Sequence, residues 1–176
     1  MMVGLVVLAL VVAACTASSS APNGNSSTAA DLTWRMAALR DVRTGQEFTI
    51  EQLHGKLVAL EPMAIWCSSC RIQQREVVVA LAATPSDNLV YVGVDVDPNE
   101  RPAALADYSV ADGFDWTFIV ASREVARSLA AAFGDQILSP PSTPLILVGP
   151  GGEVLDVHFG IRSAGELTAL FAQHLP

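Results

Sequence analysis

The chain has 176 residues, which is room for one ordinary domain. Its 18 acidic and 10 basic side chains give a net charge of −8, which excludes a nucleic-acid binder that acts through a basic patch and opposes attachment to anionic lipid through Lys and Arg. Its three cysteines are too few for a four-cysteine zinc site or for a small scaffold held together by disulfides.

The first thirty residues carry no charged side chain and are typical of an export signal. Residues 3–14 form an apolar run of twelve residues, shorter than the ~20 residues that a membrane-spanning helix needs. The run is followed by Cys15, and Val12-Ala13-Ala14-Cys15 resembles a bacterial lipobox, the motif whose cysteine is lipidated and becomes the first residue of the mature chain. A plain secretory signal or a short anchor, with Cys15 incidental, is the alternative. Each reading exports the domain to a compartment where disulfides persist.

We therefore divide the chain into a signal peptide over residues 1–15, a flexible tether over residues 16–31 and a domain over residues 32–176. The tether is composed mostly of Ser, Ala, Asn, Gly and Thr and has too little apolar surface to pack. We expect the domain to be extracytoplasmic and anchored to the cell membrane as a lipoprotein through Cys15.

The predicted elements of residues 32–176 follow the order of a single α/β domain. Strands are predicted over residues 32–40, 57–62, 88–95, 116–120, 145–148 and 154–159, with a short extended piece over residues 48–50. Helices are predicted over residues 67–83, 101–108, 122–133 and 163–175. The β-branched run over residues 88–95 is typical of a central strand buried on both faces, and the last two strands predict a hairpin.

Local signals support three of these helices. Ser122 and Ser163 precede two of them as N-caps, and Glu166, three residues after Ser163, predicts a capping box. In the helix over residues 67–83, an apolar stripe is predicted to face the core. Its members are Ile72, Val78, Val79, Leu81 and Ala82.

Two cysteines three residues apart, Cys67 and Cys70, favour a redox-active pair. On a first helical turn this spacing brings the Cα atoms within the range of about 4.4–6.8 Å that a disulfide allows. Cys67 lies nearest the unpaired N–H groups of the helix, which favour the thiolate. We therefore expect Cys67 to attack disulfides and Cys70, one turn inside, to resolve the mixed disulfide.

Two other readings of the cysteine pair remain open. A metal site would need two further ligands, and the candidates form no second paired motif. These candidates are Cys15, His54, His158 and His174. A structural disulfide is the third reading, but its very small loop would constrain the unfolded chain little.

The strand over residues 57–62, the motif Trp66-Cys67-Ser68-Ser69-Cys70 and the helix after it resemble the thioredoxin fold. The approach to this strand, through Asp41-Val-Arg-Thr-Gly45 and Leu53-His-Gly-Lys56, resembles the exported thiol–disulfide oxidoreductases of the TlpA/ResA-like family.

The C-terminal part of the domain carries the same resemblance. Ser142-Thr-Pro-Leu-Ile-Leu-Val148 is similar to the family's strand after its cis-proline, and Gly151-Gly152-Glu153-Val154 and Gly160 match the turn, strand and glycine that follow. The resemblance extends from about Leu32 to Leu175 and implies a thioredoxin-like α/β fold whose central mixed β-sheet is flanked by helices.

The resemblance also implies roles for four further residues. It implies a cis peptide bond between Thr143 and Pro144 that faces the cysteines and lets the Thr143 backbone pair with a substrate. It implies that Glu61 relays a proton to or from the inner cysteine, and a glutamate within an apolar strand is expected to have a raised pKa. Trp66 is expected to form a flat apolar wall beside the attacking cysteine.

Two positions depart from the family pattern. Arg75 stands where relatives carry a helix-kinking proline, so the helix is expected to run straighter or Arg75 to touch the substrate face. Ser68 and Ser69 stand between the cysteines, where relatives often carry proline or glycine and where the redox potential is tuned.

Other conspicuous residues are expected to be structural. Asp95, Asp97 and Glu100, after the central strand, are expected to form a solvated acidic loop. Pro140 and Pro141 are expected to be ordinary loop prolines.

We expect an extracytoplasmic thiol–disulfide oxidoreductase that reduces exported proteins through Cys67 and Cys70. We expect no metal, organic cofactor or nucleic acid, and relatives imply a membrane thiol electron donor. The neutral Ser68 and Ser69 and the acidic domain favour a reducing pair. A Sco-like copper metallochaperone is the first alternative, although that class separates its cysteines by three residues and not two. A thiol peroxidase is the second, although this chain has Ala64 where that class carries threonine.

Replacing Cys15 with serine tests the lipoprotein assignment. The protein should move from the membrane fraction to the soluble or secreted fraction and keep its redox activity, because the lipid is the expected anchor. Fractionation followed by immunoblotting measures the change. If Cys15→Ser still fractionates with membranes, the apolar run itself is the anchor.

Overall fold

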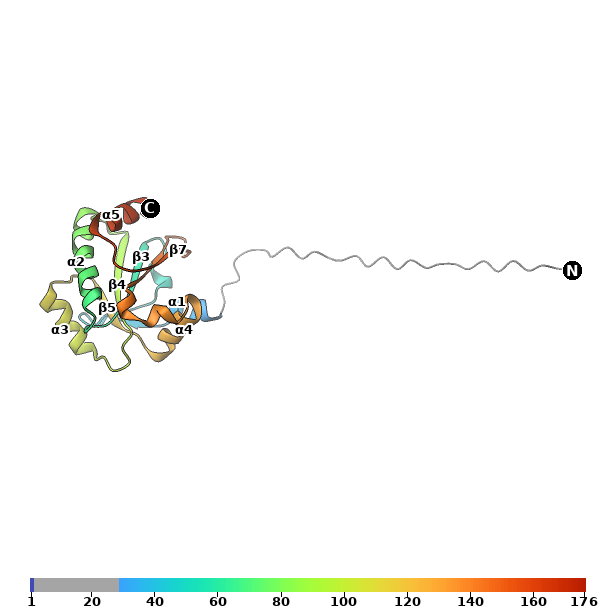
Figure 1. Ribbon diagram of the computed structural model, residues 1–176, viewed down its shortest axis with the longest axis horizontal. Helices are drawn as coiled ribbons and strands as arrows, with labels where there is room; N and C mark the ends of the chain where they lie inside the picture. Colours follow the sequence, from blue (N-terminus) through green and yellow to red (C-terminus); the bar gives the residue numbers. More distant parts are fainter. Residues whose placement is uncertain (2–28) are drawn as a thin grey trace.

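The computed structural model describes Met1 and residues 29–176 (Figure 1). The predicted signal peptide, Cys15 and all but the last three residues of the predicted tether lie outside the described residues. Within the described part of the chain, no helix is both long enough and apolar enough to cross a membrane.

A five-stranded mixed β-sheet forms the centre of the molecule, in the order β5-β4-β3-β6-β7. Its strands are β3 (Leu57–Met63), β4 (Leu89–Asp95), β5 (Thr117–Val120), β6 (Pro144–Val148) and β7 (Val154–Phe159). β3, β4 and β5 run parallel, whereas β6 pairs antiparallel with β3 and β7 antiparallel with β6. The predicted C-terminal hairpin is confirmed, and so is the mixed sheet.

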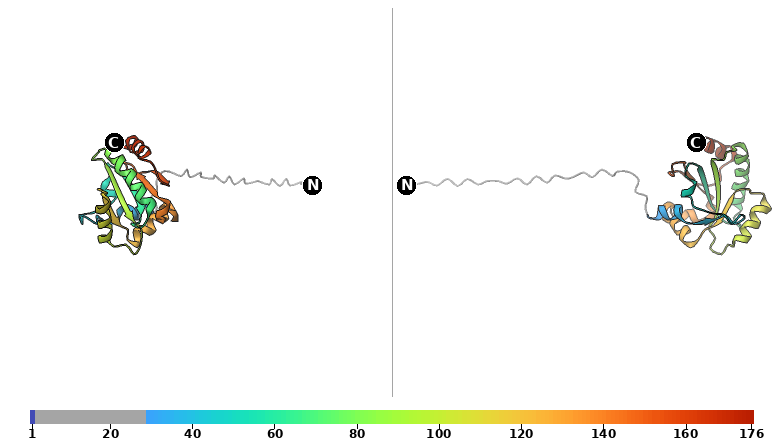
Figure 2. Two further views of the ribbon diagram at one scale, coloured as in Figure 1. Left: turned by 60° about the vertical axis from the view of Figure 1, so that its left-hand side comes forward. Right: turned by 180° about the vertical axis from the view of Figure 1, so that it is seen from behind.

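Helices cover both faces of the sheet (Figures 1 and 2). They are α1 (Ala29–Met36), α2 (Ser68–Ala83), α3 (Pro102–Asp112), α4 (Arg123–Phe133) and α5 (Ala164–His174). One apolar cluster joins the sheet to α2, α3 and α5, and a second joins its other face to α4 and to Trp34 of α1. Because side chains alternate along a strand, Leu57, Ala59 and Met63 of β3 join the first cluster and Val58 and Leu60 the second.

The predicted strand over residues 32–40 is wrong for most of its length. The chain forms α1 instead, and only Leu39–Arg40 is extended, as β1, which pairs antiparallel with β2 (Glu47–Phe48). Ala, Leu, Arg and Met in this segment are good helix formers, and α1 buries Trp34 against Phe133 of α4. The buried Trp34 anchors this short helix, whereas a strand in the same place would need a partner strand for its backbone hydrogen bonds.

The apolar stripe predicted for α2 is also wrong. Ile72, Val78 and Val79 are exposed, and the buried face of α2 is instead Cys70, Gln73, Gln74, Val77 and Ala80. Burial of Gln73 is compensated at both ends of its amide, whereas Gln74 pairs through its oxygen and its Nε2 has no partner. Gln73 exchanges two hydrogen bonds with the backbone of Arg162, and Gln74 Oε1 accepts from Tyr108 Oη at 2.5 Å.

The predicted helix caps are confirmed. Ser122 Oγ accepts from Val125 N, and Ser163 and Glu166 form a reciprocal capping box at the start of α5. These local hydrogen bonds set where α4 and α5 begin.

Candidate active site

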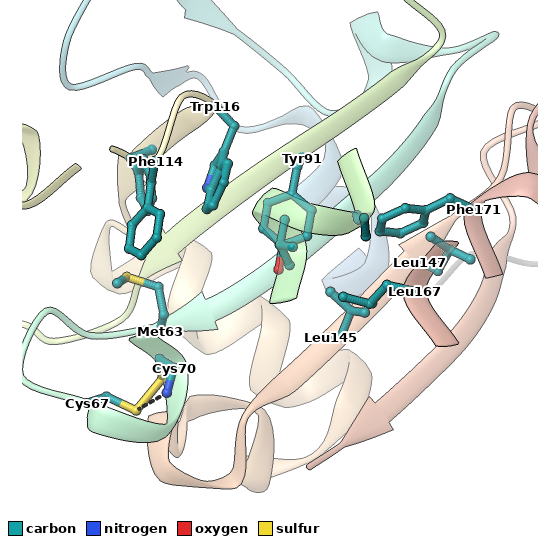
Figure 3. Packing of buried hydrophobic residues seen from close by; sticks show 14 of the residues in the cluster. Met63, Cys67, Cys70, Tyr91, Phe114, Trp116, Leu145, Leu147, Leu167 and Phe171 are labelled. Atoms are coloured by element: carbon teal, nitrogen blue, oxygen red, sulfur yellow. Dashed lines mark hydrogen bonds between the residues drawn. A yellow bond between two sulfur atoms is a disulfide. The ribbon is translucent and has the colours of Figure 1, made fainter. Parts of the chain in front are cut away.

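Cys67 and Cys70 lie at the N-terminus of α2, just beyond the end of β3. Cys67 is the N-cap residue, with extended backbone angles, and Cys70 lies in the first turn. The two form a disulfide with Cα atoms 5.3 Å apart. The backbone N–H of Cys70 donates to Cys67 Sγ at 3.1 Å (Figure 3), so sulfur occupies the place of the oxygen in an ordinary N-cap. A Cys67 thiolate at this position would be stabilised by the same N–H and by the helix dipole.

The two cysteines have different surroundings. Cys67 borders a surface hollow, and its sulfur lies 3.3 Å from Ser69 Oγ. Cys70 is completely buried, at 0% exposure. Cys67 is itself only 3% exposed, but it alone of the two cysteines borders the hollow. The attacking role of Cys67 and the resolving role of Cys70 stay predictions.

A turn before β6 packs directly against the cysteine pair. Cys70 Sγ lies 3.2 Å from the carbonyl oxygen of Pro140, and Ser69 Oγ donates to the carbonyl of Pro141 at 3.4 Å. These prolines are in a short 3₁₀ turn, η3 (Pro140–Ser142), and the expectation that they are ordinary loop prolines is wrong. The sequence offers no signal for their role, since it is their carbonyl groups that face the site.

The expected cis peptide bond between Thr143 and Pro144 is also wrong, because no peptide bond of the described residues is cis. The chain enters β6 through a left-handed conformation at Thr143 instead, with φ 48° and ψ 61°. The Thr143 N–H donates to the Pro140 carbonyl at 2.8 Å, and the residue is buried. Thr143 and Pro144 therefore lie on the buried side of the turn and support it. The Thr143 N–H is already hydrogen-bonded within the turn, so it is not free to pair with a substrate.

Glu61 lies on β3 beneath α2 and is completely buried, at 0% exposure. Its Oε2 accepts from Tyr91 Oη at 2.9 Å, while Oε1 has no hydrogen-bond partner. Burial raises the pKa of Glu61 to about 8, and hydrogen bonding with Tyr91 and Gln74 only partly offsets this. Burial also raises the pKa of Tyr91, which keeps it a neutral donor. The expected raised pKa of Glu61 is confirmed, and its proton relay remains a prediction.

Two aspartates that follow β4 fix the segment leading to Cys67. Asp95 is completely buried and accepts from Ile65 N at 3.3 Å, and Asp97 Oδ2 accepts from the indole of Trp66 at 2.7 Å. Burial raises the pKa of Asp95 to about 7, whereas hydrogen bonding to Asn99 and Trp66 lowers that of Asp97. The solvated acidic loop expected here is therefore wrong for Asp95. The sequence did contain a signal for the position of Asp95. This residue ends a strand that runs parallel to β3, and the carboxyl ends of neighbouring parallel strands meet at one edge of a sheet.

Trp66 and Arg75 border the same hollow as Cys67. Trp66 is 58% exposed, so its ring presents apolar surface to solvent. The helix α2 is uninterrupted at Arg75, where relatives carry a proline. The expected continuous helix is confirmed, and contact of Arg75 with a substrate stays a prediction.

The described residues contain no group of three His, Cys, Asp or Glu side chains that could hold a metal ion. The groups around the cysteine pair are instead hydroxyl, carbonyl, carboxyl and indole groups that position a sulfur atom or handle a proton.

No family model matches the chain, and no curated protein matches it. Solved structures do. A thiol:disulfide interchange protein of the thioredoxin family from Chlorobium tepidum TLS is 20% identical, with a TM-score of 0.64 over 80% of this chain and 93% of that one. MTB dsbF, solved in mixed oxidized and reduced forms, is 24% identical, with a TM-score of 0.61 over 80% of this chain and 96% of that one.

StoA from Bacillus subtilis is 18% identical, with a TM-score of 0.58 over 76% of this chain and 95% of that one. At these identities the likeness shows the fold. The chain therefore has the thioredoxin fold, as expected, and carries a Cys67-x-x-Cys70 disulfide at the start of α2.

The buried acid Glu61 predicts how stability depends on pH. Between about pH 4.5 and 8 the folded chain keeps a proton on Glu61 that the unfolded chain has released, so the free energy of unfolding should fall as pH rises. Asp95 acts in the same direction up to about pH 7. Replacing Glu61 with glutamine should reduce this slope by about 1 kcal/mol per pH unit.

Urea unfolding of the oxidised protein at pH 5, 6, 7 and 8 measures this slope. Glu51→Gln is the matched control, because Glu51 is exposed and its change should leave the slope as it is. A wild-type protein whose stability is constant or rises over this range would contradict the protonated state of Glu61.

Proposed function

We propose that the protein is an extracytoplasmic thiol–disulfide oxidoreductase that reduces disulfides in exported proteins. The observation that carries the proposal is the Cys67–Cys70 disulfide at the N-terminus of α2, with Cys67 Sγ as the helix N-cap. A hydrogen-bonded sulfur at the positive end of a helix is where a thiolate nucleophile is favoured.

The reaction starts from the reduced pair. The Cys67 thiolate attacks one sulfur of the substrate disulfide, forms a mixed disulfide and releases the other substrate sulfur as a thiolate. Cys70 then attacks Cys67 Sγ, which restores the Cys67–Cys70 disulfide and releases the second substrate thiolate. Two electrons pass from the protein to the substrate. The Cys67 and Cys70 protons leave to solvent, and each released substrate thiolate takes up a proton from solvent according to its own pKa.

The second step requires the buried Cys70 to lose its proton. The Pro140 carbonyl, 3.2 Å from Cys70 Sγ, would accept a hydrogen bond from the thiol and hold it neutral until the mixed disulfide has formed. Glu61, with a pKa of about 8, is poised near neutral pH to take up that proton and return it to solvent. The hydroxyl of Tyr91 holds the carboxyl group in place.

Substrate binding is proposed for Trp66, Thr143 and Pro144. Trp66 presents exposed apolar surface beside Cys67. Thr143 and Pro144 are buried and shape the turn whose carbonyls face the cysteines, so their contribution would be to position that turn. The lipobox-like Cys15 supports a membrane-anchored protein outside the cytoplasm, where a membrane thiol carrier would return electrons to the Cys67–Cys70 disulfide.

Serine substitution of each cysteine tests the proposed roles. Cys70→Ser should trap mixed disulfides with partner proteins, because Cys67 can still attack and nothing resolves the product. Cys67→Ser, its matched control, should trap few. Non-reducing gels of each variant show the adducts, and insulin reduction with dithiothreitol should be lost in both. More adducts with Cys67→Ser than with Cys70→Ser would reverse the assignment.

The redox potential tests the proposed direction. Besides the Cys70 N–H, the polar side chain that contacts Cys67 Sγ is the neutral Ser69 hydroxyl, and the nearby cation Arg71 is paired with Asp112 at 3.5 Å. The reduced form therefore lacks the strong anion stabilisation of an oxidase, and we expect a midpoint below about −200 mV. Equilibration in glutathione buffers followed by alkylation and gel shift measures it. A midpoint above about −150 mV would make the protein a disulfide donor.

A further inference from the structure

A hollow of about 390 Å³ lies beside Cys67, on the solvent side of α2. It is bordered by Ile65, Trp66, Cys67, Ser68, Arg71, Ile72 and Arg75. Cys67 forms one end of this border. A segment of another protein that lay in the hollow would therefore bring its own sulfur atom next to Cys67 Sγ.

The apolar part of the border is unusually exposed. Trp66 is 58% exposed and Ile72 is 50% exposed, and Val79 continues the apolar surface along α2 at 57%. Ile72 and Val79 face solvent because the opposite, buried face of α2 includes the hydrogen-bonded Gln73 and Gln74. Large apolar side chains gathered beside a reactive group mark an interaction surface, and a tryptophan is a frequent anchor in such surfaces.

The charged part of the border is cationic, in a chain of net charge −8. Arg71 and Arg75, one turn apart, share a single carboxylate, Asp112, at 3.5 and 4.0 Å. One carboxylate balances one of the two guanidinium groups, and Asp97, which accepts from the Trp66 indole at 2.7 Å, does not border the hollow. The side chain of Arg75 is 67% exposed, so its weak pairing leaves it available to a second anion.

We propose that this hollow binds a segment of the substrate protein that has a large apolar residue beside its disulfide-bonded cysteine and an aspartate or glutamate about three residues away. The spacing follows from geometry. Residues 68 to 75 rise by about 10 Å along a helix, and an extended segment covers that distance in about three residues. The proposal rests on the proposed function and names the substrate class on which Cys67 acts.

Other occupants of the hollow would contact or balance only part of its border. A small anionic thiol would pair with Arg71 and Arg75 but would leave Trp66 and Ile72 exposed. In a symmetric contact with a second copy of this chain, the arginines of each surface would face those of the other and their charges would stay unbalanced. The acidic and apolar substrate segment uses both halves of the border at once.

Matched disulfide peptides test the proposal. Each is a ten-residue peptide with a leucine beside its single cysteine, joined by a disulfide to a second copy of itself. In the first set, glutamate, glutamine or lysine stands three residues after the cysteine. In the second set, the same three residues stand three residues before the cysteine. The measurement is the second-order rate constant for oxidation of the reduced protein by each peptide, at about 0.15 M ionic strength and in 0.5 M NaCl.

At about 0.15 M ionic strength, where the long-range field of the net charge is screened, we expect the glutamate peptide of at least one set to react about five-fold faster than its glutamine counterpart, and the lysine peptide to be slowest. The preference should fall below about two-fold in 0.5 M NaCl, because salt screens exposed charges. Arg75→Gln should reduce the ratio of glutamate to glutamine rates to below about two-fold. Arg123→Gln, on α4 at the opposite face of the sheet, is the matched control and should keep it.

The outcomes separate the two proposals. Equal rates for glutamate and glutamine peptides, with insulin still reduced, overturn the docking site and leave the function standing. Failure to reduce insulin or any peptide overturns the function itself. An Arg75→Gln variant that slows every peptide equally and keeps the ratio overturns the role of Arg75. Dimerisation that requires Arg75, seen by sedimentation without any peptide preference, assigns the surface to a second copy of the chain and overturns the proposal.

Discussion

The unpaired N–H groups at the start of α2 are the feature on which the site depends. A helix that begins at the edge of a sheet must satisfy these donors, and here a sulfur atom, Cys67 Sγ, accepts from the Cys70 N–H. The same contact that caps the helix holds the reactive sulfur at the positive end of the helix dipole. The capping role also fixes the second cysteine, because the first turn of the helix places it inward, against the Pro140 carbonyl.

Two buried carboxyl groups lie under this helix start, and both work against stability near neutral pH. Glu61 lies on β3, and Asp95 is the last residue of the neighbouring strand β4. Burial raises the pKa of both. A carboxyl group that must lose its proton inside a protein costs free energy that an apolar residue would not. Asp95 offsets part of that cost by accepting from Ile65 N. Glu61 accepts from Tyr91 Oη through Oε2, but its other oxygen, Oε1, is buried without a partner, which is consistent with a chemical role for its proton.

Local sequence signals predicted most of the sheet and the helix caps, because β-branched runs and capping serines act through neighbours in the chain. The same signals failed where distant partners decided the outcome. α2 buries Gln73 and Gln74 because Arg162 and Tyr108 supply hydrogen bonds from other elements, and no periodicity of apolar residues contains that information. The cysteine pair was predictable from spacing alone, whereas the role of Pro140 depends on where a carbonyl group points.

The exposed face of α2 shows how local charge can differ in effect from net charge. The chain as a whole is strongly acidic, and at long range it repels an acidic partner. At physiological ionic strength, charges more than about 8 Å apart are largely screened, so a partner that reaches the surface beside Cys67 responds mainly to the groups within that distance. There Arg71 and Arg75 outnumber Asp112, their shared carboxylate. Long-range repulsion would slow encounters with acidic proteins in general, while the two arginines and the exposed Trp66 would favour a segment already in place. A surface of this kind selects by fit at the cysteine and not by attraction from a distance.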